Sequence, residues 1–202
     1  TRTAAWGASV VLHGETLAEA AAHAEQLAQE RQLVFVHPYD DAAVMAGQGT
    51  LALELLEDAP DLDALVIPVG GGGLLAGCLV AATTLRPGIA VFGVEVEAYA
   101  AMAQMLAGRA VSVGGPTIAE GIAVRDIGEM PFELVRRRVT DVLVVPERAV
   151  EEAIGLLAEG GKVVAEGAGA VGVAALLTFG SRFRNKRVGV AVTGGNIDAR
   201  IL

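Results

Sequence analysis

The sequence predicts an α/β fold in which a parallel, twisted β-sheet is flanked by helices. Short runs rich in β-branched residues alternate with longer helical patterns along the 202 residues, and this alternation is typical of strands joined by crossover helices. Glycine-rich turns follow two of the expected strands, which is where open α/β sheets bind their ligands. With 53% hydrophobic and 19% charged residues, the chain is expected to form a compact core.

Six strands are expected, each a short apolar run bounded by turn residues. Because Pro68 cannot donate a hydrogen bond to a sheet ladder, it is expected to lie at the end of its strand. The predicted strands are residues 9–12, 33–36, 65–69, 91–94, 142–145 and 188–192.

The first long helix is expected to begin after Thr16. There T-x-x-E forms a capping box, in which the Thr16 hydroxyl and the Glu19 carboxylate each accept a backbone N–H. A helix over residues 147–160 has apolar residues at helical spacing, acidic residues in its first turn and a glycine pair at its end. The other predicted helices are residues 43–56, 73–85, 98–106, 132–138 and 168–179.

Charge, hydropathy and cysteine content narrow the class of protein. Fifteen Lys and Arg against 24 Asp and Glu give a net charge of −9, so no nucleic-acid partner is expected, because a phosphate backbone would be repelled. The most apolar stretch, residues 64–85, is interrupted by glycines, and neither a membrane span nor a signal peptide is expected. The single cysteine, Cys78, lies in an apolar helical pattern, and a cytoplasmic location fits it best.

The most informative segment is LVIPVGGGGLL, residues 65–75. A β-branched run enters four consecutive glycines and then a predicted helix. Glycines without Cβ let several backbone N–H groups converge on an anion, and the helix adds the positive end of its dipole. The segment therefore predicts a phosphate-binding loop, with a flexible glycine turn as the alternative. It is not a Walker loop, because no G-K-[ST] follows, and it lacks the acidic ribose ligand of a Rossmann site.

A second glycine-rich turn, VAVTGGNID, spans residues 190–198 and follows the last predicted strand. Ligands of open α/β sheets lie beyond the carboxyl ends of the strands, so both turns are expected to line one crevice. The hydroxyl of Thr193 would then be within reach of a ring nitrogen of the ligand. An ordinary strand-ending turn is the alternative interpretation.

Four segments together resemble the fold-type II pyridoxal-phosphate enzymes. They are IPVGGGGLLAG, IAEGIAV, VVAEGAGAVGVAAL and VTGGNID, in the order and rough spacing found in that family. Within it, the chain is most similar to threonine ammonia-lyase, also called threonine dehydratase, with serine racemase a close relative. The resemblance covers nearly the whole chain and implies pyridoxal 5'-phosphate as the cofactor.

This resemblance implies cofactor-binding roles for individual residues. Gly121, in IAEGIAV, falls where the family's backbone lines the face of the cofactor. Thr193 matches the Ser, Thr or Cys that faces the pyridine nitrogen, and a neutral hydroxyl there does not hold that nitrogen protonated as a carboxylate does, which favours elimination. The residues that match the phosphate-binding loop are Gly70, Gly71, Gly72, Gly73 and Leu74.

Two acidic residues receive weaker assignments from the same resemblance. Glu95 matches the first acidic ligand of a divalent-cation site that some family members keep, but Ala101 stands where those members have an Asp. Because hard divalent cations take several oxygen ligands, a solvated or ion-paired Glu95 is the favoured alternative to metal binding. Glu166 matches a glutamate near the cofactor ring, and it would serve equally as a helix-capping carboxylate.

The lysine that forms the Schiff base in this family lies in a motif like S-F-K-x-R-G-A, which this sequence does not contain, so no catalytic residue is assigned. Its lysines are Lys162 and Lys186, and both are expected to be surface charges. Residues 1–36 resemble the end of the family's small domain, and residues 37–202 resemble its large cofactor-binding domain. The sequence is expected to be a truncated part of the catalytic region, without an allosteric domain.

These assignments predict part of a lyase that converts L-threonine, and also L-serine, to a 2-oxo acid and ammonia. Without the lysine, the chain alone is expected to show little or no activity. A serine racemase-like enzyme is the alternative within the family, and a non-catalytic phosphate-binding or assembly module is the alternative outside it. Family membership also implies homodimers, and a truncated chain with an exposed apolar face would associate as well.

Overall fold

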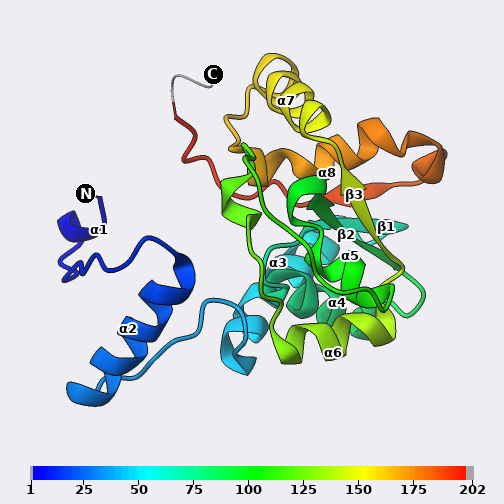
Figure 1. Cartoon of the computed structure of the whole chain (residues 1–202). Coiled ribbons are helices and arrows are strands. Elements are labelled where there is room, and N and C mark those ends of the chain that lie inside the picture. Colours follow the sequence, from blue (N-terminus) through cyan, green and yellow to red (C-terminus); the bar gives the residue numbers. More distant parts are fainter. Residues whose placement is uncertain (1, 199–202) are drawn as a thin grey trace. The chain divides into compact units, whose positions relative to one another are not determined.

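A computed structural model describes residues 2–198 of the chain (Figure 1). The chain divides into two compact units, Thr1–His37 and Pro38–Leu202. Helices α1 and α2 belong to the first unit, and the sheet with the remaining helices belongs to the second. None of the helices in the described part is both long and apolar enough to cross a membrane.

The first unit contains α1 (Arg2–Ala5) and α2 (Leu17–Glu30). The predicted capping box is confirmed, because the Glu19 N–H donates to the Thr16 hydroxyl (3.2 Å) and the Thr16 N–H donates to the Glu19 carboxylate (3.2 Å). Backbone hydrogen bonds from Glu15 and Thr16 lower the pKa of Glu19. No residue of α2 is buried.

The strands predicted at residues 9–12 and 33–36 are wrong. Both segments are irregular in the structure, and apolar side chains along them are exposed, for example Leu12 (89%) and Val34 (88%). A β-branched run becomes a strand only when a neighbouring strand completes its hydrogen bonds. Within the described residues, neither segment pairs with another strand.

The second unit is built on a parallel sheet of four strands in the order β3-β2-β1-β4. Four of the predicted strands are thereby confirmed, although the last ends two residues early. Pro68 is the final residue of its strand, as expected. The strands are β1 (Ala64–Pro68), β2 (Ala90–Val96), β3 (Asp141–Val145) and β4 (Val188–Val190).

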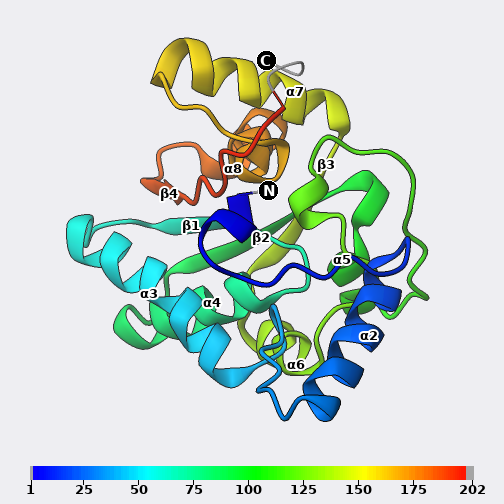
Figure 2. The same cartoon turned by 90° about the vertical axis from the view of Figure 1, so that its left-hand side faces the viewer.

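Helices cover both faces of this sheet (Figure 2). One face carries α3 (Ala42–Asp58), α4 (Gly73–Leu85), α5 (Ala101–Leu106) and α6 (Glu129–Arg138). The other carries α7 (Glu147–Leu156), which continues into a π-helical turn at Leu157–Gly161, and α8 (Gly167–Thr178). Short 3₁₀ turns lie at Glu97–Tyr99, Glu120–Ile122 and Gly180–Phe183.

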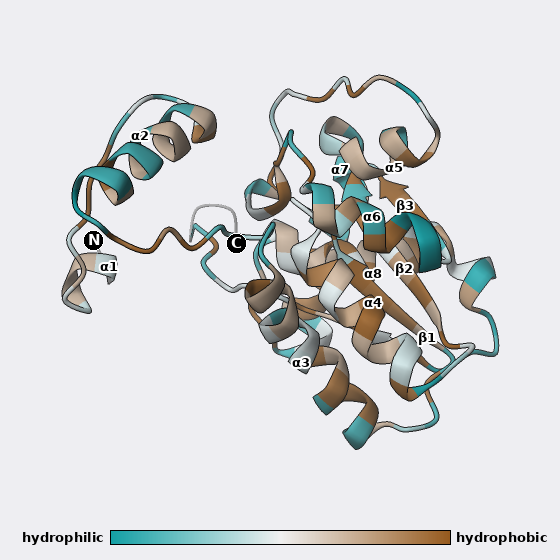
Figure 3. Cartoon of the chain, turned by 90° about the horizontal axis from the view of Figure 1, so that it is seen from below, coloured by the Kyte–Doolittle hydropathy of each residue, from teal (hydrophilic) through white to brown (hydrophobic). Residues whose placement is uncertain are grey.

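The strand residues alternate between two hydrophobic cores. Leu65 and Ile67 of β1 pack with the core under α3 and α4, whereas Val66 packs with the core under α7 and α8. All five residues of β1 are buried, and the strands are largely brown, hydrophobic, in Figure 3. Burial of a strand on both faces explains the continuous apolar runs of the sequence.

Helices α3 and α4 approach each other closely through glycines. A Cβ on Gly77 would overlap with the carbonyl oxygen of Met45, and one on Gly49 would lie 2.9 Å from the carbonyl oxygen of Gly77. The neighbouring Cys78 is fully buried, and its thiol donates to the Gln48 carbonyl (3.6 Å). Burial raises the pKa of this thiol to about 11, so Cys78 is the small hydrophobic residue that its sequence context predicted.

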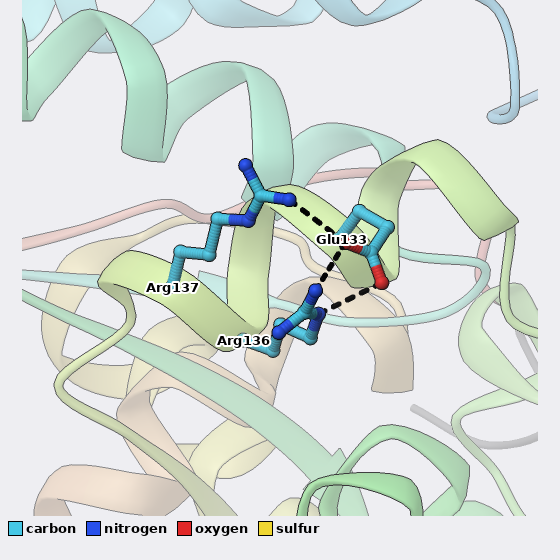
Figure 4. Close-up of polar contacts among 3 residues, drawn as sticks. All are labelled: Glu133, Arg136 and Arg137. Carbon is cyan, nitrogen blue, oxygen red and sulfur yellow. Dashed lines mark hydrogen bonds and ion pairs between the residues drawn. The ribbon is translucent and has the colours of Figure 1, made fainter.

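The C-terminal turn of α6 carries three consecutive arginines. Glu133 accepts hydrogen bonds from Arg136 (2.6 Å) and Arg137 (3.2 Å), and all three side chains are exposed (Figure 4). The hydrogen bond from Arg136 is the main cause of the lowered pKa of Glu133. Cations at a helix C-terminus also interact favourably with the helix dipole. This surface cluster lies on a solvated helix end and is an ordinary feature of helix termini.

Candidate functional site

The two glycine-rich turns leave the same edge of the sheet. Strands β1 and β4 are parallel neighbours, with Val66 opposite Val190. β1 continues into the glycine loop, residues 70–74, and β4 continues into the turn at residues 193–196. Parallel neighbouring strands end at one edge, so this arrangement satisfies the condition under which an open α/β sheet binds a ligand.

The segment containing Gly121 lies in space between these two turns and contacts both of their neighbourhoods. A Cβ on Gly70 would lie 3.3 Å from the Cα of Ile122 and 3.6 Å from the Gly121 carbonyl oxygen. On its other side, Gly121 lies against Glu166, whose Oε1 would be 3.1 Å from a Cβ on Gly121 and would overlap with one on Gly194. The structure therefore brings Gly70, Gly121 and the turn after β4 into one cluster.

The glycine loop has the geometry of an anion-binding site. Gly72 precedes α4 with a φ of +97°, in the left-handed region that favours glycine, and α4 begins at Gly73. The first N–H groups of α4 have no acceptor within the helix, and they lie at the positive end of its dipole. A Cβ on Gly73 would lie 2.7 Å from the carbonyl oxygen of Tyr39, so this backbone is closely packed from behind. The loop therefore fits a phosphate group.

Tyr39 supports the glycine loop, and Asp40 supports the start of helix α6. Sequence reasoning did not identify either role. The Tyr39 ring lies directly on Gly71, where it would overlap with a Cβ, and its hydroxyl donates to the Asp126 carbonyl (3.0 Å). Desolvation raises the pKa of Tyr39. The Asp40 carboxylate accepts the first N–H groups of α6 (2.9 and 3.1 Å). In the sequence, Y-D-D before a predicted helix indicates only a cap for that helix, which Asp41 provides.

Glycines at the start of α8 bring the remaining segments together. A Cβ on Gly169 would overlap with the carbonyl oxygen of Thr193, and one on Gly167 would overlap with that of Ile118. The helix can lie this close to both backbones because these positions have no side chain. Thr193 itself is half-buried. A cavity of about 460 Å³ lies beside this cluster, and Gly121, Glu166 and Gly167 are among its lining residues.

Glu95 is buried and forms no ion pair with another described residue, so the favoured alternative of a solvated or ion-paired carboxylate is wrong. It is 1% exposed, and its two carboxylate oxygens accept the N–H groups of Met102 (2.8 Å) and Ala103 (2.9 Å) at the start of α5. Burial raises its pKa to about 7, against the opposing effect of these hydrogen bonds. Among residues 2–198, no group of three or more His, Cys, Asp or Glu side chains could hold a metal ion. The observed contacts make Glu95 a helix cap.

Both lysines are exposed. Lys162 follows the π-helical turn after α7 with a φ of +55°, and its ammonium group donates to the Glu159 carbonyl (2.8 Å). Lys186 lies in the loop before β4. Exposed amines are well hydrated, whereas a nucleophilic lysine is activated by desolvation or by a neighbouring cation.

A parallel α/β domain with a glycine-rich loop and a hydroxyl-bearing turn at one sheet edge is typical of proteins that bind a phosphate-bearing cofactor. The family model described as "Pyridoxal-phosphate dependent enzyme" matches residues 1–194, and the chain belongs to this family.

Curated relatives include an L-threonine ammonia-lyase of Thermotoga maritima, 45% identical over 100% of this chain and 51% of the relative. An L-threonine dehydratase of Staphylococcus aureus is 39% identical over 97% of this chain and 58% of the relative. The chain thus spans only about half the length of these relatives.

Solved structures with the same fold include a maize serine racemase, with a TM-score of 0.91 and 31% identity over 97% of this chain and 63% of that one. A threonine deaminase from T.th. has a TM-score of 0.89 and 40% identity over 96% of this chain and 65% of that one. The predicted fold class and the predicted family are both confirmed.

Proposed function

We propose that this chain is the cofactor-binding part of a pyridoxal-phosphate-dependent lyase that deaminates L-threonine and L-serine to 2-oxo acids and ammonia. The observation that carries the proposal is the meeting of the glycine loop, Gly121 and the Thr193 turn at one sheet edge. Relatives at 39–45% identity are named threonine ammonia-lyase, threonine dehydratase and threonine deaminase.

The glycine loop is assigned to the phosphate of the cofactor. The groups that would hold it are backbone N–H groups of the loop and of the first residues of α4, namely those of Gly70, Gly71, Gly72, Gly73 and Leu74. Donors fixed in the backbone need no reorganisation to meet an anion, and the helix dipole adds to the attraction. Tyr39 packs against the loop, so the N–H groups of the loop are held in place before the cofactor arrives.

Thr193 and Gly121 are assigned to the ring of the cofactor. The Thr193 hydroxyl would hydrogen-bond the ring nitrogen, and the backbone at Gly121 would line the ring face. When bound, the cofactor withdraws electrons from the α-carbon of the amino acid, so that the α-proton and the β-hydroxyl can be lost. A neutral hydroxyl beside the nitrogen leaves it less positive than a carboxylate would, which favours elimination.

Sequence identity favours the lyase over a racemase. The T.th. threonine deaminase and the maize serine racemase match the fold almost equally well, with TM-scores of 0.89 and 0.91, but their identities are 40% and 31%. The fold alone does not separate these two reactions. The Thermotoga maritima ammonia-lyase, at 45% identity, points in the same direction.

The chain by itself is proposed to bind the cofactor without completing the reaction. Neither Lys162 nor Lys186 has the desolvated setting of a lysine that carries the cofactor. The α-proton would therefore have no amine placed to remove it. Association into homodimers is also proposed, on the resemblance alone.

The test is a titration of the purified chain with pyridoxal 5'-phosphate, followed by absorption spectroscopy, borohydride reduction and peptide mapping. Saturable binding that inorganic phosphate displaces, with no reduced adduct on a lysine and no release of 2-oxobutanoate from L-threonine, is the expected result. Gly73→Ala should weaken binding, because a Cβ there meets the Tyr39 backbone, whereas Gly155→Ala in α7 meets nothing within 4 Å and serves as the control.

Two results would contradict the proposal. Binding that is unaffected by Gly73→Ala and by phosphate would remove the glycine loop from the site. Specific reduction onto Lys162 or Lys186, with turnover of L-threonine, would show that the chain carries its own catalytic lysine.

A further inference from the structure

Glu166 lies where backbone segments of the site meet, yet its carboxylate does not cap its own helix. It is the N-cap residue of α8, and its side chain forms no capping hydrogen bond there. Of the two interpretations of Glu166 open from the sequence, helix capping by this carboxylate is therefore wrong. Instead, its Oε2 accepts the N–H of Asn196 (3.2 Å).

The same residue contacts both segments assigned to the cofactor ring. Its backbone N–H donates to the Gly194 carbonyl (3.2 Å). Its Oε1 would overlap with a Cβ on Gly194 and would lie 3.1 Å from one on Gly121. Gly194 has a φ of +69°, so this position needs glycine for its backbone conformation as well as for the space that the carboxylate occupies.

The turn at residues 193–196 is thus held from one residue by two hydrogen bonds, one to its carbonyl at Gly194 and one from its N–H at Asn196. A carboxylate is a stronger acceptor than a neutral oxygen, because hydrogen bonds to an ionised group are roughly twice as strong. Gly169 of α8 lies against the same turn, because a Cβ there would overlap with the Thr193 carbonyl oxygen. Among these groups that contact the turn, the Glu166 carboxylate is the charged one.

We infer that Glu166 is a positioning residue. Through the turn, it holds the Thr193 hydroxyl where that hydroxyl would reach the ring nitrogen of the cofactor. It acts through the turn at residues 193–196, to which its backbone N–H and its carboxylate are hydrogen-bonded. The inference rests on the proposed function for the role of Thr193, and it goes beyond that proposal by naming what fixes this residue in place.

The test compares two ligands and one local probe in the purified chain. Pyridoxal 5'-phosphate uses both the loop and Thr193, whereas inorganic phosphate uses the loop alone. Glu166→Ala and Thr193→Val should each weaken pyridoxal 5'-phosphate binding about fivefold, the loss of about one net hydrogen bond, and leave phosphate binding within about twofold. The double variant should lose no more than either single variant, because residues that act through one contact are non-additive.

A cofactor-independent measurement accompanies the binding data. Amide hydrogen exchange at Asn196 should become about tenfold faster in Glu166→Ala, since its acceptor is removed. Glu166→Gln keeps one acceptor oxygen and should fall between Glu166→Ala and the natural chain. The control is Glu151→Ala, an exposed carboxylate on α7, which should change neither exchange nor binding.

The outcomes separate this inference from the proposed function. Unchanged exchange at Asn196, or additive losses in the double variant, would overturn the positioning role. Equal weakening of phosphate and pyridoxal 5'-phosphate by Glu166→Ala would also overturn it, because the residue would then act on the whole domain. If Asn196 exchanges faster but Thr193→Val binds pyridoxal 5'-phosphate normally, the hydroxyl assignment in the proposed function fails, and the positioning role for the ring fails with it.

Discussion

The close crossing of α3 and α4 makes a strong prediction about Gly77. Gly77→Ala should destabilise the second unit, because the new Cβ overlaps with the Met45 carbonyl of α3, a backbone atom that cannot move without shifting the helix. The two helices would have to separate, and the core beneath them, which includes Leu79 and Ala52, would lose contact. Overpacking of this kind typically costs about 1 to 3 kcal/mol.

Gly47→Ala in α3 is the matched control. Nothing lies within 4 Å of a Cβ there, so the substitution should stabilise the unit by up to about 1 kcal/mol through helix propensity. Both substitutions change the unfolded chain in the same way. The difference between Gly77→Ala and Gly47→Ala therefore isolates the overlap, and we expect it to be about 1 to 3 kcal/mol.

The assay is urea denaturation followed by circular dichroism, with the unfolding free energies of the two variants compared at equal slope. An unchanged slope would show that both variants expose the same surface on unfolding. A difference below about 0.5 kcal/mol would refute the reasoning, since it would mean that the helices do not meet at Gly77.

Three further predictions concern other parts of the chain. The pKa of Glu95 is raised from 4.5 to about 7 in the folded state, so between these pH values the native state binds a proton that the unfolded state has lost. The free energy of unfolding should therefore fall as pH rises from 4.5 to 7, by about 3 kcal/mol at most. Glu95→Gln should flatten this dependence in urea titrations, and an equally steep fall would contradict the assignment. Gly169→Ala should displace the Thr193 turn and weaken pyridoxal 5'-phosphate binding several-fold, measured by absorption titration beside Gly155→Ala, and equal affinities would show that the turn does not rest on α8. Thr16→Ala should remove the cap of α2 at a cost of about 1 kcal/mol, seen as faster amide exchange in that helix alone; unchanged exchange would mean that the cap is dispensable.

Local patterns predicted most of the second unit. The helix after the glycine loop begins and ends where its pattern indicated, at Gly73 and Leu85, because an apolar run between a glycine turn and a charged residue allows few other interpretations. The strands predicted at residues 65–69 and 142–145 were equally clear, since strands inside a parallel sheet are covered on both faces and need no alternation. The first unit was harder, because its β-branched runs have no partner strand within the described residues.

Side chains that act across long sequence separations were beyond local patterns. Tyr39 donates to the carbonyl of Asp126, 87 residues away, and Asp40 caps a helix that begins 89 residues later. The environment of Glu95 also differed from the expectation of a solvated or ion-paired side chain. A carboxylate in a strand gives no local sign that the first N–H groups of a later helix will donate to both of its oxygens. Such contacts depend on how the crossover connections return to the sheet.

The sequence by itself determined the parallel α/β architecture and the family, and it predicted the phosphate loop, because each depends on residue types at short, regular spacing. Only the tertiary structure decided that Glu95 is a buried helix cap, that Tyr39 supports the loop and that Glu166 contacts the Thr193 turn. The physical reason is that a buried or half-buried polar side chain takes the partner that packing places beside it, and that partner is set by the whole chain.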